Sequence, residues 1–500
     1  MQRVISPQAM QACEKHYFDT SGVASIAVME RAAQALVQAA LDRFPGIRHV
    51  CIACGPGGNG GDGYACARLL RKRGIDCIIF ASAPARHPDA VLNARRAAEC
   101  GVEIMDAQRL EGMPLPDLWI DCLYGTGFSR TPEGASAAII RRIGGDHDRG
   151  CGVIACDIPS GLNGHTGTAC ELCVQADITI AFQLAKYGHF LQDGLDMCGE
   201  VIVRDVGFPD AIFPDALPEC IESGDLRPLL PKRRLNIHKG GCGHLLIIAG
   251  SAGMAGAAAL CAKAALRSGA GLVTVACPEE IVPILQVHAP CAMCHPLPQE
   301  DGCLSAAALG NIREILPGKS AVAIGPGLSR RVPPEILRAV LESGLPAAID
   351  ADALNILSAH PELKSLLRPH HVLTPHPGEA ARLLERDCAD PVADAQELAE
   401  AGASVVLKGA SRVICASDRI LISTSGGCGM ARGGSGDVLT GLLGGLLADR
   451  TARTAVESAA CACEIHGLAG ALAQEKYGSR AMNAADIIEF LPEVFTRYGE

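Results

Sequence analysis

The stretch Gly426-Gly-Cys-Gly-Met-Ala-Arg-Gly-Gly-Ser-Gly-Asp-Val-Leu-Thr-Gly441 concentrates glycine just before one acid and an apolar run. Glycine adopts positive φ readily and lets backbone approach a ligand closely. A helix that begins near Ser435–Asp437 would direct its free N–H groups and the positive end of its dipole into this loop. The stretch therefore predicts an anion site, most simply for a phosphate, with the Asp437 carboxylate beside it. The alternative is a tight turn between helices.

The composition of the chain narrows the class of protein. Of its 500 residues, 49% are hydrophobic and 20% are charged, so it can bury sizeable cores. A net charge of −11 argues against a nucleic-acid partner, and 3% aromatic residues leave few platforms for stacked bases. The N-terminus lacks the apolar core of a signal peptide, and no run of about 18 apolar residues predicts a membrane helix. We expect a cytoplasmic protein with no nucleic-acid or membrane partner.

Twenty-four cysteines are many for one chain. Without a signal sequence, they are expected to be reduced and mostly buried as small hydrophobic residues. Three Cys-x-x-Cys pairs occur, at Cys51/Cys54, Cys170/Cys173 and Cys291/Cys294. Any two pairs could form a four-thiolate zinc site. The first pair lies on a predicted strand, where residues i and i+3 point to opposite faces, so chance spacing is the favoured interpretation.

In the first half, a predicted buried strand at 49–54 is followed by Gly55-Pro-Gly-Gly-Asn-Gly-Gly-Asp-Gly63 and by a predicted helix, Tyr64–Arg73. This order of strand, glycine loop and helix holds a phosphate or a dinucleotide at the carboxyl edge of a parallel sheet. The loop does not match Gly-x-Gly-x-x-Gly with an acid about twenty residues later, so an ordinary Rossmann cofactor site is a poor fit. Its distinctive side chains are Asn59 and Asp62. The alternative is a bare structural turn.

Two more predicted strands end at acids, Asp121 and Asp157, and Ser160 follows the second. In a doubly wound sheet these strand ends converge on one crevice. Asp121, the Asn59 carbonyl and the Ser160 hydroxyl could form an all-oxygen site for a hard cation. One carboxylate with neutral oxygens suits a monovalent ion better than magnesium. Asp157 is the candidate for acid/base chemistry. Each acid alone could instead cap a helix.

The motifs Gly-Pro-Gly-x-Asn-Gly-Gly-Asp-Gly, Asp-x-x-x-Gly-Thr-Gly and Asp-Ile-Pro-Ser-Gly resemble those of the NAD(P)H-hydrate epimerase family. The resemblance extends from Met29-Glu30-Arg31 to about Val206-Gly207. It implies a Rossmann-like fold that interconverts the R and S hydrates of NADH and NADPH, with potassium bound by Asn59, Asp121 and Ser160. The substrate contacts that it implies are Gly58, Asn59, Gly60, Gly61, Asp62, Gly125, Thr126, Gly127, Phe128, Ser129, Arg130, Thr131 and Asp157.

The sequence departs from this family at Gly58, where the family usually has asparagine. The change removes one side-chain contact and leaves the backbone cradle of the loop in place.

The proline-spotted segment Pro209–Pro231 predicts a linker between a domain at 1–215 and a second domain at 225–500. A new series of strands and helices begins at about His244, so the second domain has its own α/β sheet. Lys408 follows a predicted strand and would bring an ammonium group within reach of a phosphate. His376, between two prolines, is predicted to contact a ligand; the alternative is a role in stabilising its loop.

The glycine loop with its acid and helix resembles the ribokinase-like superfamily, in which that acid is the base facing the transferred phosphoryl group. His-Lys-Gly, Gly-Pro-Gly, Asp-Ala-Asp-Ala-Leu-Asn, Leu-Thr-Pro-His-Pro-Gly-Glu and Gly-Gly-x-Gly-Asp-Val-Leu-Thr-Gly resemble the ADP-dependent NAD(P)H-hydrate dehydratase family over about residues 225–495. The hydrate contacts so implied are Ala257, Gly327, His376 and Asp437. The implied ADP and AMP contacts, with magnesium bound alongside ADP, are Lys408, Gly409, Ala410, Ser411, Arg412 and Gly436.

This half also departs from its family, at Cys428, where proline is frequent, and at Arg432, where threonine is usual. Arg432 is expected to add a cation near the phosphates.

The two resemblances together imply a bifunctional repair enzyme. It would epimerise the R and S hydrates and dehydrate the S form at the expense of ADP, giving NAD(P)H, AMP and phosphate. Assembly into a homo-oligomer is also expected from the dehydratase resemblance. One alternative is a vitamin or sugar kinase, which would not predict Thr-Pro-His-Pro-Gly-Glu or the fused first domain. Another is a non-catalytic first domain, and the presence of Asn59, Asp121, Asp157 and Ser160 speaks against it.

Overall fold

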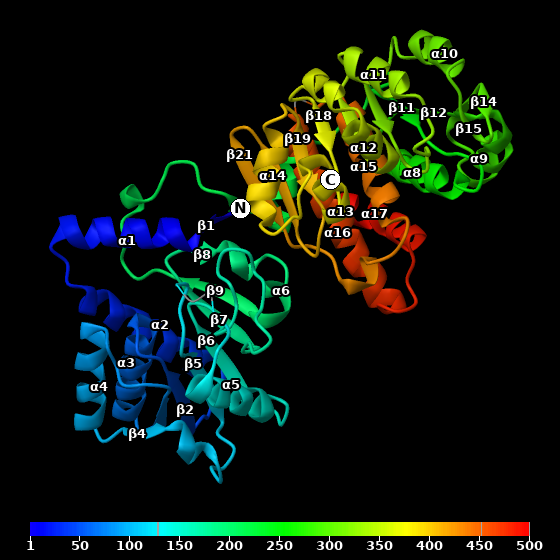
Figure 1. Ribbon diagram of the computed structural model, residues 1–500. Coiled ribbons are helices and arrows are strands. Elements are labelled where there is room, and N and C mark those ends of the chain that lie inside the picture. Colours follow the sequence, from blue (N-terminus) through cyan, green and yellow to red (C-terminus); the bar gives the residue numbers. More distant parts are fainter. Residues whose placement is uncertain (128–129, 452, 500) are drawn as a thin grey trace. The chain divides into compact units, whose positions relative to one another are not determined.

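The structure is a computed structural model of the 500-residue chain, and it describes residues 1–127, 130–451 and 453–499 (Figure 1). The chain folds into two compact units. The first is Arg3–Pro218, and the second is Glu219–Glu500 together with Met1–Gln2. Each unit contains an extended, mainly parallel sheet with helices packed on it. Both units are therefore α/β domains, as the sequence predicts.

The first domain is built on a parallel sheet of seven strands in the order β4-β3-β2-β5-β6-β7-β9. From β2 the chain adds β3 and β4 on one side, and from β5 it adds β6, β7 and β9 on the other side. The strand order therefore reverses between β2 and β5, and ligands bind at the carboxyl ends of such a switch point in doubly wound folds. The predicted Rossmann-like class is confirmed. The strands are β2 (His49–Cys54), β3 (Asp76–Ala81), β4 (Glu103–Asp106), β5 (Leu118–Cys122), β6 (Gly152–Cys156), β7 (Ile178–Phe182) and β9 (Glu200–Arg204).

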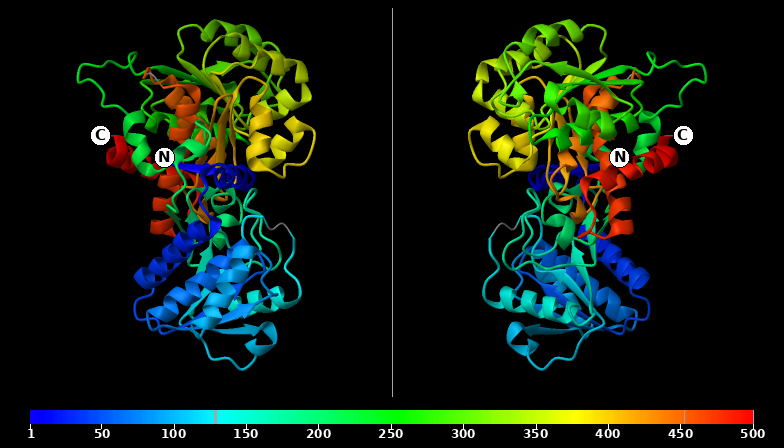
Figure 2. Two further views of the ribbon diagram at one scale, coloured as in Figure 1. Left: turned by 90° about the vertical axis from the view of Figure 1, so that its left-hand side faces the viewer. Right: turned by 90° about the vertical axis from the view of Figure 1, so that its right-hand side faces the viewer.

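Helices cover both faces of this sheet (Figure 2). One buried cluster joins the sheet to α2 (Ser25–Arg43), α3 (Gly58–Lys72) and α4 (Pro88–Glu99), and another joins the opposite face to α5 (Gly134–His147). The remaining named elements of this domain are α1 (Pro7–Ser21), α6 (Gly194–Met197) and the short strands β1 (Gln2–Ile5) and β8 (Ala185–Lys186), which pair in parallel.

The cysteines behave as small hydrophobic residues. All twenty-four are free. Cys51 and Cys54 lie in the two different clusters on opposite faces of the sheet, as the strand geometry predicts. Over the described ranges, no group of three or more His, Cys, Asp or Glu side chains is placed to hold a metal ion, so the zinc alternative has no support there.

The second domain has a mixed sheet in the order β13-β12-β11-β16-β17-β18-β19-β20-β21-β10. Strands from β13 to β19 are parallel, and β20 is antiparallel to both of its neighbours. The strands are β10 (Glu219–Cys220), β11 (His244–Ile248), β12 (Leu272–Pro278), β13 (Met293–Leu297), β16 (Ala321–Ile324), β17 (Ala347–Ile349), β18 (His371–Leu373), β19 (Ser404–Leu407), β20 (Arg412–Ala416) and β21 (Arg419–Ser423).

One buried cluster joins this sheet to four helices on one face, α8 (Ala255–Arg267), α15 (Ser435–Ala448), α16 (Ala455–Tyr477) and α17 (Ala484–Gly499). The α/β class predicted for this domain is confirmed. The other elements are α7 (Leu226–Leu229), α9 (Val282–His288), α10 (Ala308–Ile315), α11 (Pro334–Glu342), α12 (Ala351–Ala359), α13 (Pro377–Leu384), α14 (Pro391–Ala399), and the hairpin of β14 (Gln299–Glu300) and β15 (Cys303–Leu304).

Two local predictions differ from the structure. Helix α3 begins at Gly58, inside the glycine loop, whereas the sequence pattern placed its start at Tyr64. The glycines let the first turns pack directly on backbone, because a Cβ at Gly60 would lie 1.9 Å from the Gly55 carbonyl oxygen. The segment predicted as a linker contains β10 and α7. None of the helices in the described part of the chain is both long enough and apolar enough to cross a membrane.

Close packing of α3 on the sheet generates a stability prediction. A Cβ at Gly63 would lie 2.7 Å from Cys54 Sγ and 2.8 Å from Cys122 Cβ. We expect Gly63→Ala to lower the free energy of unfolding of the first domain by about 1–3 kcal/mol, because the core has no room for the methyl group. Urea unfolding followed by the fluorescence of Trp119, which is buried in this domain, measures the change.

The matched control is Gly144→Ala on α5, where nothing lies within 4 Å of the added Cβ. It should leave stability unchanged or raise it by about 0.5–1 kcal/mol. Equal effects of the two substitutions would contradict the packing argument.

Candidate functional site

The first domain has a cavity of about 550 Å³ at the carboxyl ends of its central strands. Helices α1 to α4 contribute to its wall, as do the loops after β2, β5 and β6. The residues predicted from sequence that line this cavity are Gly58, Asn59, Asp62, Gly125, Thr126, Gly127, Arg130 and Asp157. These loops meet because their strands are neighbours in the sheet.

Other predicted contacts are placed differently. Gly60 and Gly61 are buried in α3, where added Cβ atoms would strike Gly55 and Met29. Thr131 is exposed and is not part of the cavity wall. The predicted residues Phe128 and Ser129 lie outside the described ranges.

The three predicted cation ligands are joined by one hydrogen-bond chain. Asp121, fully buried at the end of β5, accepts bonds from Ser160 Oγ (2.7 Å), Ser160 N (2.7 Å) and Leu123 N (3.1 Å). Ser160 Oγ accepts from Tyr124 N (2.9 Å), and Asn59 Nδ2 donates to Tyr124 O (2.9 Å). Burial outweighs these bonds and raises the pKa of Asp121 to about 6. A bound cation would favour the charged form of Asp121. The donor set is a carboxylate, a hydroxyl and an amide oxygen, and these ligands fit a monovalent ion.

Several acids face the same cavity. Burial raises the pKa of Asp62 well above its usual value and that of Glu14, on α1, to about 7. Asp157, which also lines the cavity, is paired with Lys186, whose Nζ lies 2.5 Å from Asp157 Oδ1. Glu14, Lys186 and His189 were not predicted from sequence, because no motif marks these positions. The His189 ring accepts a hydrogen bond from the Lys186 backbone N–H.

In the second domain, α15 begins at Ser435 and places Asp437 in its first turn, as the sequence predicts. Gly434 precedes the helix and has φ = +94°. This backbone conformation is unfavourable for a residue with a side chain. Ser435 Oγ donates to the Met430 carbonyl (2.8 Å) and so ties the helix start to the glycine loop. Asp437 is half-buried, and burial, aided by the negative charge of Asp350, raises its pKa to about 7.

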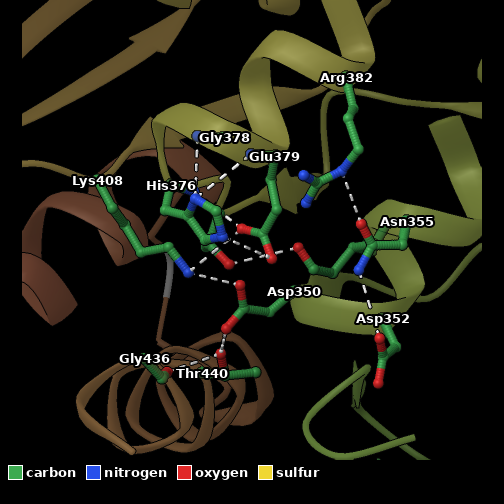
Figure 3. A network of polar contacts seen from close by, with 12 residues as sticks. Asp350, Asp352, Asn355, His376, Gly378, Glu379, Arg382, Lys408, Gly436 and Thr440 are labelled. Carbon is green, nitrogen blue, oxygen red and sulfur yellow. Dashed lines mark hydrogen bonds and ion pairs between the residues drawn. The ribbon is translucent and has the colours of Figure 1, made fainter. Parts of the chain in front are cut away.

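Asp350, at the start of α12, is the centre of a buried network that joins several elements (Figure 3). Its Oδ1 accepts from Lys408 Nζ (2.7 Å), and its Oδ2 accepts from Thr440 Oγ1 (2.6 Å), which lies on α15. Glu379 Oε2 lies 4.0 Å from the same ammonium group. A Cβ at Gly436 would come within 3.5 Å of Lys408 Nζ. The network brings the predicted residues Lys408 and Gly436 to the start of α15.

His376 caps helix α13. Its Nδ1 accepts from the backbone N–H groups of Gly378 (3.0 Å) and Glu379 (3.3 Å), and its own N–H donates to Glu379 Oε2 (2.9 Å). The His376 side chain therefore stabilises its loop, as the alternative interpretation of the sequence predicts. Because Nδ1 accepts, the ring proton is assigned to Nε2, and the ring is 53% exposed. His376 can cap the helix and still donate a hydrogen bond outward.

Gly327 and Ala257 lie together. Gly327 has φ = +60°, and a Cβ on it would be 3.1 Å from the Ala257 methyl group. A Cβ on Gly327 would also lie 2.8 Å from the Met254 carbonyl oxygen, so the backbone packs closely at this point of the domain.

The residues after Lys408 occupy different environments. Gly409 and Ala410 are exposed, and Ser411 is buried. Arg412 is buried on β20 and donates to the Ser425 carbonyl, so its side chain supports the glycine loop. Arg432, expected near the phosphates, donates to the carbonyls of residues 479 and 480.

Comparison with known proteins assigns both halves of the chain. A family model described as NAD(P)H-hydrate dehydratase matches residues 245–493, and one described as YjeF-related protein N-terminus matches residues 25–188. A crystal structure of ADP/ATP-dependent NAD(P)H-hydrate dehydratase from Bacillus subtilis, co-crystallized with ATP/Mg²⁺, matches with a TM-score of 0.48 and 27% identity. That match covers 56% of this chain and 99% of the Bacillus chain.

Relatives of nearly the same length are more informative. The bifunctional NAD(P)H-hydrate repair enzyme Nnr of Coxiella burnetii is 35% identical over 489 residues, which cover 94% of this chain and 95% of that protein. The enzyme of the same name from Moorella thermoacetica is 36% identical over 501 residues, which cover 96% and 94%. With such identity over almost the whole length, the chain belongs to the family of bifunctional NAD(P)H-hydrate repair enzymes.

Proposed function

We propose that this chain repairs hydrated NADH and NADPH in two steps. The first domain, 1–215, interconverts the R and S hydrates. The second, 225–500, dehydrates the S hydrate with ADP and gives NAD(P)H, AMP and phosphate. The observation that supports this most directly is Asp437, a half-buried acid in the first turn of α15 beside the Lys408–Asp350 pair. That arrangement suits phosphoryl transfer to a hydroxyl group.

Phosphorylation solves the chemical difficulty of dehydration, because hydroxide is a poor leaving group. The oxygen of the C6 hydroxyl attacks the terminal phosphorus of ADP, AMP departs, and Asp437 accepts the hydroxyl proton. The lone pair on the ring nitrogen then expels phosphate from C6. Loss of a proton from C5 restores the dihydropyridine. The free N–H groups at the start of α15 stabilise negative charge on the transferred group.

The remaining residues hold the two substrates. Lys408 would exchange its bond to Asp350 for a phosphate oxygen, and Gly436 leaves the backbone of α15 open beside it. The proposed nucleotide contacts are Lys408, Gly409, Ala410, Ser411, Arg412 and Gly436. The proposed hydrate contacts are Ala257, Gly327, His376 and Asp437.

A bound magnesium ion would neutralise negative charge on the phosphates of ADP. The described residues offer no cage of three or more acidic or histidine ligands. The ion would therefore be held largely by phosphate oxygens, which is common for magnesium.

In the first domain, the hydrate would occupy the 550 Å³ cavity. Its proposed contacts are the loops Gly58–Asp62 and Gly125–Thr131 together with Asp157, which is the acid/base group. Potassium would be held by Asn59, Asp121 and Ser160, and its charge would help to order the two loops that meet there.

Replacement of the proposed base tests the dehydratase. Full-length protein, hydrated NADH, ADP and Mg²⁺ should restore the absorbance of the reduced nicotinamide. Asp437→Asn should lower kcat by about 10²–10⁴-fold, a general base's usual contribution, while ADP binding measured by calorimetry is retained. Asp418→Asn, an exposed aspartate of the same domain, is the control. An active Asp437→Asn enzyme would refute the role, and no recovery with wild-type protein would refute the function.

The charge of Asp350 predicts a pH effect. The base must be ionised, and the pKa of Asp437 is about 7, so kcat/KM for dehydration should rise as the pH passes through about 7. Asp350→Asn removes a negative charge that raises the pKa of Asp437. The acidic limb of the profile should therefore move to lower pH in this variant. A limb that stays in place or moves upward would show that Asp350 does not control the base.

The buried Asp121 predicts a potassium requirement. Replacement of K⁺ by a large organic cation should slow conversion of the R hydrate to the S hydrate, because the Asp121 carboxylate loses its counter-ion. Asp121→Asn should be slow in both salts. Dehydration of pure S hydrate by the same samples corrects for general salt effects. Epimerisation at full rate without K⁺ would argue against the ion site.

A further inference from the structure

A lysine lies directly behind the Asp157 carboxylate. Lys186 Nζ donates to Asp157 Oδ1 at 2.5 Å and to the Phe182 carbonyl at 3.3 Å. The Lys186 side chain is 2% exposed and is not part of the cavity wall, whereas Asp157 lines the cavity. The cation is thus on the protein side of the carboxylate, and the space for a substrate is on the other side.

His189 holds the backbone of the same aspartate. Its Nε2 donates to the Asp157 carbonyl oxygen (2.8 Å), and its Nδ1 accepts from the Lys186 backbone N–H (3.1 Å). Burial lowers the pKa of His189 to about 4, so the ring is neutral and can fill both roles. Asp157 needs this support because its φ is +63°, which is uncommon and costly for a residue with a side chain.

The contacts leave one carboxylate oxygen available. Both hydrogen bonds to the Asp157 side chain, from Lys186 Nζ and from Phe182 N (3.2 Å), reach Oδ1. Within the described residues, no hydrogen bond reaches Oδ2. The aspartate is therefore fixed at its backbone and at one oxygen, and its second oxygen is open on a residue that faces the cavity.

We propose that Lys186 and His189 are positioning residues for epimerisation, which hold the Asp157 carboxylate and keep its free oxygen directed at the hydrate. The proposal rests on the epimerase function proposed above. If the ring opens, the carboxylate takes the C6 hydroxyl proton, a C6–O double bond forms, and the electron pair of the N1–C6 bond moves to N1, which takes up a proton. Closure on the other face reverses these changes. No oxidant or reductant is needed.

The surroundings explain why a lysine is needed. The other titratable side chains in the cavity wall are Glu14 on α1, Asp62 on α3, Tyr124 after β5, His87 and Asp89 at the start of α4, and Arg130. Acidic side chains therefore outnumber basic ones in the cavity wall around Asp157. Burial already favours the neutral form of Glu14 and Asp62. The Lys186 ammonium gives Asp157 a positive partner at hydrogen-bond distance, on the side of the carboxylate away from the cavity.

A buried ion pair can also be purely structural, and the experiment must separate the two roles. Full-length Lys186→Met keeps the length of the side chain and removes its charge. We expect kcat for epimerisation to fall by about 100-fold or more with KM nearly unchanged. The acidic limb of the rate profile should move to higher pH, because loss of a neighbouring positive charge disfavours the charged form of a carboxyl group. The matched control, Lys72→Met, removes an exposed lysine from α3.

The chain contains its own control for folding. Dehydration of pure S hydrate by the same Lys186→Met sample should keep its wild-type rate, and Trp119 fluorescence reports the first domain. If the Met variant does not fold, Lys186→Arg and His189→Gln decide. The first should keep the acidic limb in place, and the second should lower kcat without moving that limb.

The possible outcomes are distinct. Full epimerase activity in Lys186→Met overturns the proposal, as does a loss that is uniform across pH or that appears only in KM. If wild-type protein itself fails to interconvert the hydrates, the proposed epimerase function fails. Wild-type activity with an unaffected Lys186→Met variant overturns only the role of Lys186.

Discussion

Parallel strand pairing is the constraint on which both sites depend. In a parallel sheet every strand ends at the same edge, so loops far apart in sequence must meet there. In the first domain, β2, β5 and β6 are neighbours, and their loops bring Asn59, Asp121 and Asp157 to one edge. In the second, the strand ends supply Asp350 and Lys408, and α15 closes the group from the side. The chemistry of each domain is thus a result of its strand order.

Each domain also pairs one aspartate with one lysine, but the two pairs differ in which member faces outward. Lys186 is buried behind Asp157, so the acid is presented to the cavity. At the second site Asp350 is the buried member, 3% exposed, and Lys408 is 19% exposed. The same two side chains therefore present a carboxylate in one domain and an ammonium group in the other, which suits the proton transfer and the phosphate binding proposed for them.

Much of this could be predicted from sequence, because local patterns carry it. Apolar runs followed by glycines and acids located the strands and loops, and Ser435–Asp437 was recognised as a helix start. Other features depend on contacts between distant residues: Asp350 meets Thr440 90 positions later, and Asp157 meets Lys186 29 positions later. No local sequence pattern predicts such pairs of distant residues. Misplacing the start of α3 has a related cause, since glycine has low helix propensity and only packing makes a helix of 58–63 favourable.

The bond between Lys408 and Asp350 has a consequence for the turnover of nucleotides. In the proposed function, a phosphate that reaches this ammonium group would replace an anion that belongs to the protein. Phosphate binding would then exchange one anion for another at Lys408. The cost of breaking the Lys408–Asp350 bond would offset part of the electrostatic gain. The same carboxylate would pair with the lysine again when the phosphate leaves, which would offset part of the electrostatic cost of dissociation. An enzyme that must discard both AMP and phosphate after each cycle benefits from holding them loosely.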